Sequence, residues 1–308
     1  MELLGSRTNR INVMSASADK NGTRKANSPI EVATMLCHAH MDFGIQCLKS
    51  MQLRSVQAIT LRVHDDGTLD SNDKSRLDNE LSDYRLITRE EGMESARKLV
   101  NGRPNLTRFA SEHVFAIKLL EIPALGSEIL HYCDCDIYFY RSFANLFDLR
   151  AQSADYVFLP DIWSGYSVNA ADASFFAEYP CVSNANAGLF SFDMKLYDLD
   201  LLERVFSDDR FKGWPALQEQ TAWPILGARG RSRGLAPSQF AMISPRTRFR
   251  PHWIAAHFSG PGRCRFEDLS LKTGSSASLA VRTRPARRLT PTRYRAYKLY
   301  TKIFRRWS

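Results

Sequence analysis

The sequence predicts an α/β domain built on a mostly parallel sheet with helices on its faces. Short apolar segments alternate with amphipathic segments of about ten residues, which is typical of βαβ units. The chain has 308 residues, of which 44% are hydrophobic and 24% charged, and this composition excludes disorder throughout. No run approaches the roughly 18 consecutive apolar residues of a membrane-spanning helix. These observations indicate one large globular domain.

The first half of the chain shows this alternation most clearly. Residues 31–39 form a short apolar run, and residues 41–51 follow with helical spacing. Residues 56–63 are strand-like and end at the turn His64-Asp65-Asp66-Gly67. The pattern then predicts a helix over 72–81, a strand over 84–87 and a helix over 90–100. Ligands of such sheets bind beyond the carboxyl ends of the strands, so functional residues are expected there.

The second half is less regular. A helix is expected over 109–120, followed by a strand over 128–133 that runs directly into Asp134-Cys135-Asp136. Residues 137–140 continue in extended form. Further elements are expected as strands over 155–160 and 186–193 and as a short helix over 218–226.

The charge distribution separates a body from its two ends. Residues 1–29 are polar, lack periodicity and contain no apolar stretch typical of a signal peptide, which predicts a flexible leader and a cytoplasmic protein. Residues 30–272 are expected to form the domain, and residues 273–308 a linker and a basic tail. The net charge is +9, and residues 281–308 contain ten Lys or Arg and no acid. The body is therefore nearly neutral, and the excess charge is confined to the tail.

The segment ILHYCDCDIYFY, residues 129–140, places two carboxylates at the end of an apolar strand. Alternate residues of an extended chain face the same side, so Asp134 and Asp136 can share one hard cation. Burying both carboxylates without such a partner would be costly. The spacing alone is weak evidence, because Asp198-Leu199-Asp200 has it too, and an exposed acidic strand end is the alternative.

The six cysteines are scattered along the chain, which favours reduced core residues over disulfides. A zinc site made from His131, Cys133 and Cys135 would need a second close pair of ligands. The sequence shows no such pair, so zinc is not expected.

The strand with its two aspartates resembles the metal motif of the nucleotide-sugar glycosyltransferases of the GT-A fold. Other segments over about residues 30–265 resemble that family in the same order. They are 31–51 with His38 and Asp42, the turn HDDGTL at 64–69, Asn186-Ala187-Gly188-Leu189, Glu219-Gln220, and His257-Phe258-Ser259-Gly260-Pro261-Gly262-Arg263. The last segment is similar to the closing motif H-F-x-G-x-x-K of family 8. Arg263 stands where that motif has Lys, and Cys135 where Ser or Ala is commoner.

This resemblance implies a single GT-A domain, a Rossmann-like mixed but mostly parallel sheet flanked by helices, and a role for each matching residue. The implied ligands of one Mn²⁺ or Mg²⁺ ion are Asp134, Asp136 and His257. The implied nucleotide contacts are His38, Asp42, Asp134 and Arg263. The implied substrate contacts are Asn186, Ala187 and Gly188, and the implied catalytic or sugar-contacting pair is Glu219 and Gln220.

The implied activity is metal-dependent transfer of a sugar from a nucleoside-diphosphate sugar, with a UDP-sugar expected, to a glycan or lipid-linked acceptor. A divalent cation can neutralise the charge that develops on the departing diphosphate, and Arg263 would add a fixed positive charge. A lone histidine is more often structural, so the role of His257 depends on its companions. Trp214, Trp223 and Trp253 are candidates for stacking on sugar rings, although aromatic residues are more often core.

The basic tail, residues 281–308, has its own pattern. Thr290-Pro291 opens a predicted helix in which Tyr294, Tyr297, Tyr300, Phe304 and Trp307 share one face. Arg and Lys cover the remainder, which favours peripheral attachment to an anionic membrane surface over binding of RNA. A solvated tail without a partner is the third reading.

Two other functions use the same residues differently. A nucleotidyltransferase could use the acidic pair for phosphoryl chemistry, but no Gly-rich phosphate loop with Lys follows the first strand. A basic protein that binds a membrane or RNA without catalysis would not need Asp134 and Asp136. The glycosyltransferase prediction therefore depends on those two carboxylates.

Overall fold

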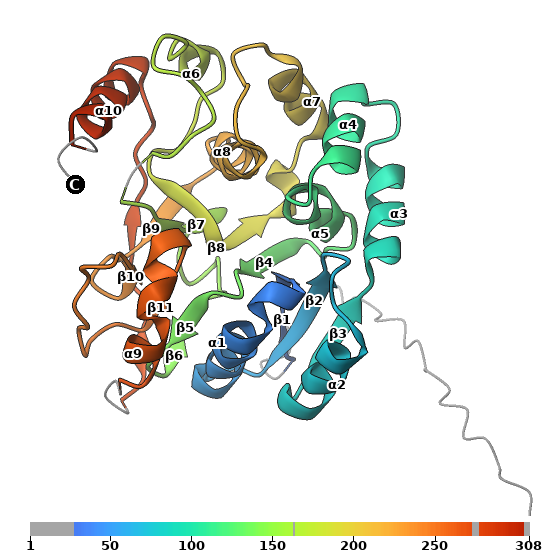
Figure 1. Cartoon of the computed structure of the whole chain (residues 1–308). Helices are drawn as coiled ribbons and strands as arrows, with labels where there is room; N and C mark the ends of the chain where they lie inside the picture. The colour runs from blue at the N-terminus through green and yellow to red at the C-terminus, as the bar shows by residue number, and fades with distance from the viewer. Residues whose placement is uncertain (1–27, 163, 273–276, 305–308) are drawn as a thin grey trace, which may run out of the picture.

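The computed structural model describes residues 28–162, 164–272 and 277–304, and it contains a mixed eight-stranded sheet flanked by helices (Figure 1). The strand order is β13-β9-β7-β8-β4-β1-β2-β3. Its strands are β1 (Ile30–Leu36), β2 (Ile59–Asp65), β3 (Tyr84–Ile87), β4 (Ile129–Cys133), β7 (Tyr156–Pro160), β8 (Ala185–Asp193), β9 (Ser232–Leu235) and β13 (Thr283–Pro285). The predicted α/β class is confirmed.

In the half of the sheet that contains β1 to β4, all strand pairs are parallel. Strand β1 pairs in parallel with β2 and with β4, and β2 pairs in parallel with β3. Strand β8 is antiparallel to both of its neighbours, β4 and β7. In β1, the adjacent residues Val32 and Ala33 are both buried. A parallel strand covered on both faces needs such continuous apolar sequence.

The helices cover both faces of the sheet. They are α1 (Met41–Arg54), α2 (Ser71–Glu80), α3 (Arg89–Leu99), α4 (Pro104–Glu112), α5 (Ile122–Ala124), α6 (Phe175–Glu178), α7 (Leu199–Ser207), α8 (Pro215–Gly227), α9 (Phe266–Ser270) and α10 (Pro291–Phe304). One apolar cluster gathers buried side chains of α1 and α2, including Leu48 and Leu77. A second gathers those of α3, α4, α7 and α8, with Trp223 at 4.6 Å from the ring of Phe190. Trp223 is therefore a core residue.

Two short sheets lie beside the main one. Strand β11 (Ala255–His257) pairs in parallel with β10 (Phe240–Met242) and antiparallel with β5 (Ile137–Phe139). Strand β12 (Leu279–Ala280) pairs with β6 (Phe143–Ala144). The sheet of β5, β10 and β11 has its own small apolar cluster, which includes Trp253 and Phe258. Because β5 follows β4 in the chain, this pairing brings residues 255–257 next to the end of β4.

The helix predicted over 109–120 is wrong in its extent. Helix α4 starts at Pro104 and ends at Glu112, because His113 has an extended backbone, with φ −135° and ψ 127°. The chain then forms a π-helical turn, η2 (Ile117–Glu121), in which all five residues are buried. The break falls at the polar stretch Ser111-Glu112-His113, and the apolar residues on either side of it are spaced as in one continuous helix, so the spacing alone did not reveal it.

The C-terminal segment differs from the expected separate tail. Strand β13 pairs with β9 at one edge of the main sheet, and Tyr294 of α10 is fully buried against the domain. Strand β13 and Tyr294 thus attach this segment to the domain. Residues 1–27 of the expected leader, residues 273–276 of the expected linker and the aromatic residue Trp307 lie outside the described residues. None of the described helices combines the length and apolar character needed to cross a bilayer.

Candidate active site

The two predicted carboxylates, Asp134 and Asp136, lie close together just after the end of β4. Strand β4 stops at Cys133, and the backbone of Asp134 donates to the carbonyl of Gly188 on β8 over 2.6 Å. The Asp134 side chain is 22% exposed, and that of Asp136 is 5% exposed. Cys135 between them is buried under α1. The chain turns at this point, and the backbone N–H of Ile137 donates to the carbonyl of Asp134 over 3.3 Å, so a turn between β4 and β5 presents the two carboxylates where the sequence had predicted an extended chain.

Strand pairing brings His257 to these carboxylates. In the antiparallel pair of β5 and β11, His257 lies opposite Ile137, the residue after Asp136. His257 Nε2 lies 2.9 Å from Asp136 Oδ1 and 3.7 Å from Asp134 Oδ2. One ligand atom from each of these three residues lies within 4.8 Å of the others. This spacing suits a single cation.

Buried polar atoms in this cluster support a cation site. Asp136 Oδ1 and His257 Nδ1 make no hydrogen bond to any described residue, although Asp136 Oδ1 lies close to the imidazole. Burial raises the pKa of Asp136, but the charges of His257 and Arg263 outweigh burial and hold that pKa well below its usual range. Burial lowers the pKa of His257, and the two aspartates outweigh it and raise that pKa. Two carboxylates and an imidazole fit Mn²⁺ or Mg²⁺ in ligand chemistry.

Arg263 lies at the exposed side of this cluster. Its Nη2 lies 2.9 Å from Asp136 Oδ2, and its side chain is 40% exposed. His40, on the turn that opens α1, contacts Arg263 Nη1 over 2.9 Å. Sequence reasoning missed His40, because a single histidine in a polar turn carries no pattern.

The predicted segment Asn186-Ala187-Gly188 borders the same cluster from β8. A Cβ on Gly188 would lie 2.6 Å from His257 Cε1 and 2.8 Å from Asp134 Oδ2, so only glycine fits here. The backbone N–H of Gly188 donates to Asn186 Oδ1 over 2.8 Å. Asn186 Nδ2 in turn donates to Gln220 Oε1 over 3.3 Å. The segment therefore connects the carboxylates to α8.

A buried lysine joins Glu219 to the site, and the sequence had not indicated it. Lys118 of η2 places Nζ 3.0 Å from Asp134 Oδ1 and 3.7 Å from Glu219 Oε2. Burial raises the pKa of Glu219 to about 7, with Asp134 adding to the effect and Lys118 opposing it. A charged residue within an apolar run, IKLLE, was the only signal for Lys118.

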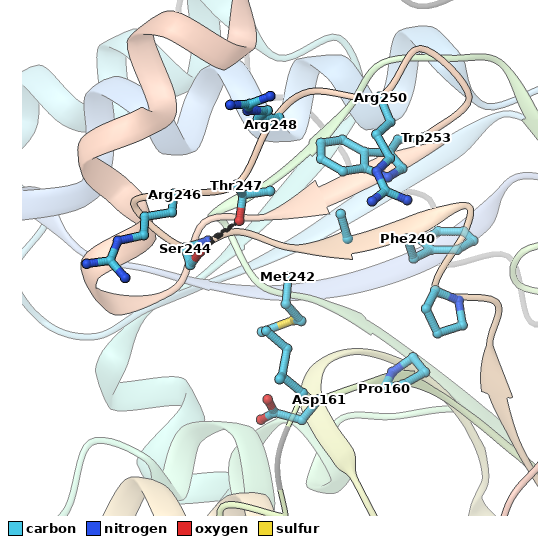
Figure 2. Close-up of a pocket in the computed structure, with 13 residues that line it drawn as sticks. Pro160, Asp161, Phe240, Met242, Ser244, Arg246, Thr247, Arg248, Arg250 and Trp253 are labelled. Atoms are coloured by element: carbon cyan, nitrogen blue, oxygen red, sulfur yellow. Dashed lines mark hydrogen bonds between the residues drawn. The ribbon is translucent and has the colours of Figure 1, made fainter. Parts of the chain in front are cut away.

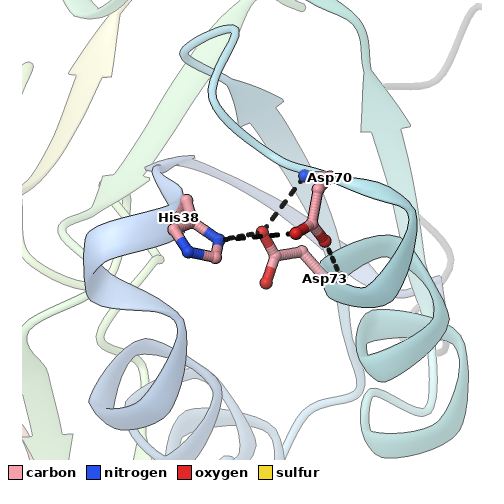
Figure 3. Close-up of side chains that lie close together, drawn as sticks. All are labelled: His38, Asp70 and Asp73. Carbon is pink, nitrogen blue, oxygen red and sulfur yellow. Dashed lines mark hydrogen bonds and ion pairs between the residues drawn. The ribbon is translucent and has the colours of Figure 1, made fainter.

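Of the other two predicted residues, His38 lies just after the carboxyl end of β1, facing Asp73 of α2 (Figure 3), and Asp42 lies in the first turn of α1. His38 Nδ1 lies 2.6 Å from Asp73 Oδ2, and this hydrogen bond raises the pKa of His38. Asp42 is 91% exposed and pairs with Arg76 over 2.9 Å. Asp73 already accepts from the backbone of Asp70 in the capping box of α2. The described structure gives neither His38 nor Asp42 a direct contact with the carboxylate cluster, so their roles stay predictions.

A mixed sheet with β4 ending in two aspartates, and a histidine delivered from a short neighbouring sheet, has the architecture of the GT-A fold. Solved structures agree. Mouse xyloside xylosyltransferase 1 matches with a TM-score of 0.54 at 12% identity, over 74% of this chain and 98% of that one. An active-site mutant of LgtC matches with a TM-score of 0.51 at 13% identity, over 78% of this chain and 95% of that one.

A bifunctional glycosyltransferase, WbbM, matches with a TM-score of 0.51 at 14% identity. This match covers 77% of the present chain and 47% of that chain, about half of its length. No protein-family model matches the sequence, and no curated protein matches it. These likenesses show the GT-A fold.

Proposed function

We propose that the protein is a metal-dependent glycosyltransferase that moves a sugar from a nucleoside-diphosphate sugar to an acceptor. The observation that carries this proposal is the convergence of Asp134, Asp136 and His257 at the carboxyl end of β4. The fold supports it, because the similar solved structures bear the names of glycosyltransferases. Ligands of open α/β sheets bind at such strand ends.

The proposed cation is Mn²⁺ or Mg²⁺. When bound, such an ion neutralises the negative charge that develops on the departing diphosphate. Asp136 offers an oxygen without a hydrogen bond, and His257 offers Nε2 on the same side. The imidazole must be neutral to coordinate, so cation binding competes with the proton that the two aspartates favour on His257.

A UDP-sugar is the proposed donor, and this choice rests on the resemblance of the sequence motifs. Arg263 is placed to supply positive charge to the diphosphate, since its guanidinium is part-exposed and beside Asp136. His38 and Asp42 are the proposed nucleotide contacts, and both are exposed, His38 just after β1 and Asp42 in the first turn of α1.

The proposed contacts of the transferred sugar come from β8 and α8. Asn186 and Gln220 are linked by a hydrogen bond, and Gln220 also donates to the carbonyl of Gly165 over 3.0 Å. Glu219 is buried behind Lys118 and would act through that charge on Asp134. Glu219 is thus a proposed positioning residue, while Gln220 can contact the sugar.

The proposed acceptor is a glycan or a lipid-linked sugar, and peripheral attachment to an anionic membrane surface remains part of the proposal. Helix α10 supports it with exposed Arg293, Arg295, Leu299 and Tyr300. Each basic residue near an anionic bilayer contributes about 1 kcal/mol, and salt weakens this attraction. Sedimentation with anionic and neutral liposomes tests it, and equal binding to both would contradict it.

Nucleotide binding and metal-dependent turnover test the main proposal. UDP with Mn²⁺ should raise the melting temperature, because a ligand at 100 times its Kd stabilises the folded state by about 2.7 kcal/mol. Hydrolysis of, or transfer from, a UDP-sugar should stop with a chelator and return with Mn²⁺. A protein that neither UDP nor GDP stabilises would contradict the nucleotide-sugar proposal.

Asp136→Asn is the sharpest variant, because it removes a ligand charge with little change of shape. Metal-dependent turnover should fall at least about a hundredfold. Asp200→Asn is the matched control, since Asp200 belongs to the other D-x-D of the chain and its side chain is 74% exposed. Initial rates at saturating Mn²⁺ make the comparison. Equal rates for the two variants would refute a role for Asp136 in cation binding.

A further inference from the structure

A cavity of about 650 Å³ lies next to the carboxylate site and takes no part in the function proposed so far (Figure 2). Met242 of β10 lines it, with Pro160 and Asp161 from the end of β7 on the wall opposite the loop 243–253. Trp253 and Phe240 add aromatic surface to the same cavity. The lining is thus partly apolar and partly charged.

Two contacts fix this cavity beside the candidate active site. In the parallel pair of β10 and β11, Met242 lies opposite His257, one of the three candidate cation ligands. On the other wall, Asp161 Oδ2 accepts from Asn186 Nδ2 over 3.4 Å. Asn186 also bonds Gln220 and Gly188, so the cavity shares a wall with the proposed sugar site.

The loop 243–253 supplies the charge. Arg246, Arg248 and Arg250 all line the cavity and all are at least partly exposed. Between them, Phe249 turns inward and packs against Tyr140, with ring centroids 5.1 Å apart. Within the described part of the chain, none of the three arginines forms an ion pair, and Asp161 is the one acid that lines the cavity.

The loop is also held in place by its own hydrogen bonds. Thr247 Oγ1 accepts from the backbone N–H of Ser244 over 2.8 Å, closing a turn. Arg265 donates to the carbonyls of Pro245 and Thr247 over 2.8 and 3.1 Å. Three guanidinium groups are therefore presented on a fixed backbone, and no described acid pairs with their charge.

We propose that this cavity binds the acceptor through an anionic group, a phosphate or a carboxylate, held by Arg246, Arg248 and Arg250. This proposal rests on the proposed glycosyltransferase function and names the chemical class of its acceptor. Guanidinium groups match the paired oxygens of phosphate and carboxylate. Phe240 and Trp253 also line the cavity, but they are 3% and 4% exposed, so they offer a ligand little surface and the charged loop is the main recognition element. The anion binds at the loop while the acceptor hydroxyl reaches toward Asn186.

Direct binding tests the cavity without donor or cation. Calorimetry with glucose 6-phosphate, glucuronic acid and glucose separates a phosphate source from a carboxylate source and from a neutral sugar. At least one of the two anions should bind about tenfold or more tightly than glucose, and added salt should weaken it. The affinity of the triple variant Arg246→Gln/Arg248→Gln/Arg250→Gln for that anion should be lower by about tenfold or more.

The control is a second triple variant, which removes three positive charges at a distance from the cavity. Arg85, Arg97 and Arg108 are exposed on β3, α3 and α4 and do not line the cavity. Their replacement by Gln should change anion binding less than about twofold. Equal losses in both triple variants, equal affinity for glucose and the anions, or no binding of either anion would overturn the proposal.

Donor hydrolysis separates this inference from the proposed function. The cavity variant should hydrolyse a UDP-sugar at the wild-type rate and bind UDP unchanged, since its three arginines lie outside the candidate cation site. A wild-type protein without metal-dependent hydrolysis would refute the proposed function, whatever the calorimetry of the anions shows. Loss of hydrolysis in a folded cavity variant would place the arginines at the donor and overturn the acceptor proposal.

Discussion

Lys118 balances the negative charge at the centre of the candidate site. Its ammonium group is buried, contacts Asp134 and Glu219, and lies 4.6 Å from the ring centroid of Tyr132. Burial lowers the pKa of Lys118, but the two carboxylates outweigh burial and raise it. A charge in this position is tolerated only because it is paired, and removing it leaves its partners unpaired.

Lys118→Met should therefore lower the free energy of unfolding by about 3–5 kcal/mol, the usual result of breaking a buried ion pair from one side. Urea denaturation measures it. Lys98→Met is the control, because Lys98 on α3 is 75% exposed and should change stability by less than about 1 kcal/mol. Adding Glu219→Gln to the Lys118 variant should restore part of the loss. Equal free energies of unfolding for Lys118→Met and Lys98→Met would contradict the pairing of Lys118 with the two carboxylates.

Glu219 gives the stability of the protein a defined dependence on pH. Its pKa rises from an ordinary 4.5 to about 7 in the folded state, first through burial. The folded protein then binds more protons than the unfolded chain between these values, so stability falls as pH rises from 4.5 to 7. The Glu219→Gln variant lacks this loss, which amounts to about 3 kcal/mol at most. Urea denaturation of the wild type and of Glu219→Gln at a series of pH values measures this loss. The same pH dependence of the free energy of unfolding in both proteins would contradict it.

At the scale of elements, the site depends on how closely β8 approaches β4 and β11. Gly188 has no room for a side chain, since Asp134, His257 and Asn186 Oδ1 all lie within 2.8 Å of a Cβ built there. The close approach places the backbone carbonyl of Gly188 on the N–H of Asp134. The positions of Asp134 and His257, two of the three candidate cation ligands, thus depend on the absence of a side chain at Gly188.

Gly188→Ala should separate the strands, lower stability by about 1–3 kcal/mol and abolish metal-dependent turnover. Gly165→Ala is the matched control, because a Cβ there meets its nearest neighbour, Gln220 Nε2, at 3.5 Å, an ordinary contact. Thermal unfolding and initial rates with Mn²⁺ compare the two variants. Full activity of the Gly188 variant would show that the strands can move apart without loss.

Local pattern predicted some elements of the site and not others. The end of β4 was predictable, because two carboxylates that follow an apolar strand are costly to bury unless they have a partner. Resemblance located His257 and Gly188, whose meeting depends on long-range strand pairing. Lys118 was missed, since its carboxylate partners, Asp134 and Glu219, are far away in the sequence and no local pattern connects them.

At the scale of the whole molecule, the C-terminal segment completes the domain. The hydroxyl of Tyr294 donates to the carbonyl of Val168 over 2.6 Å and lies 3.0 Å from the carbonyl of Tyr166, and its ring centroid lies 4.7 Å from that of Phe176. Of the aromatic face that the spacing predicted, Tyr294 is buried and Tyr297 half-buried, whereas Tyr300 is 46% exposed. That pattern is the same for a membrane and for a protein surface, so the sequence could not assign the partner of Tyr294.

Tyr294→Ala should lower the free energy of unfolding by about 3–5 kcal/mol, because it empties a buried aromatic site. Tyr300→Ala on the same helix should cost less than about 1 kcal/mol, since Tyr300 is 46% exposed. Tyr294→Phe isolates the hydroxyl and should cost about 1 kcal/mol. Urea denaturation compares all three. Equal stability of the two alanine variants would mean that α10 does not dock in solution.

The two outer strands of the main sheet bear on how the protein behaves in concentrated solution. Strand β3 has four residues and carries exposed Arg85, while β13 has three and carries exposed Arg284 followed by Pro285. Short edges with a fixed charge, and a proline that offers no N–H, are poor templates for a strand from another molecule. The largest sheet of the protein is thereby protected at both ends against the edge-to-edge joining that begins fibrous aggregation.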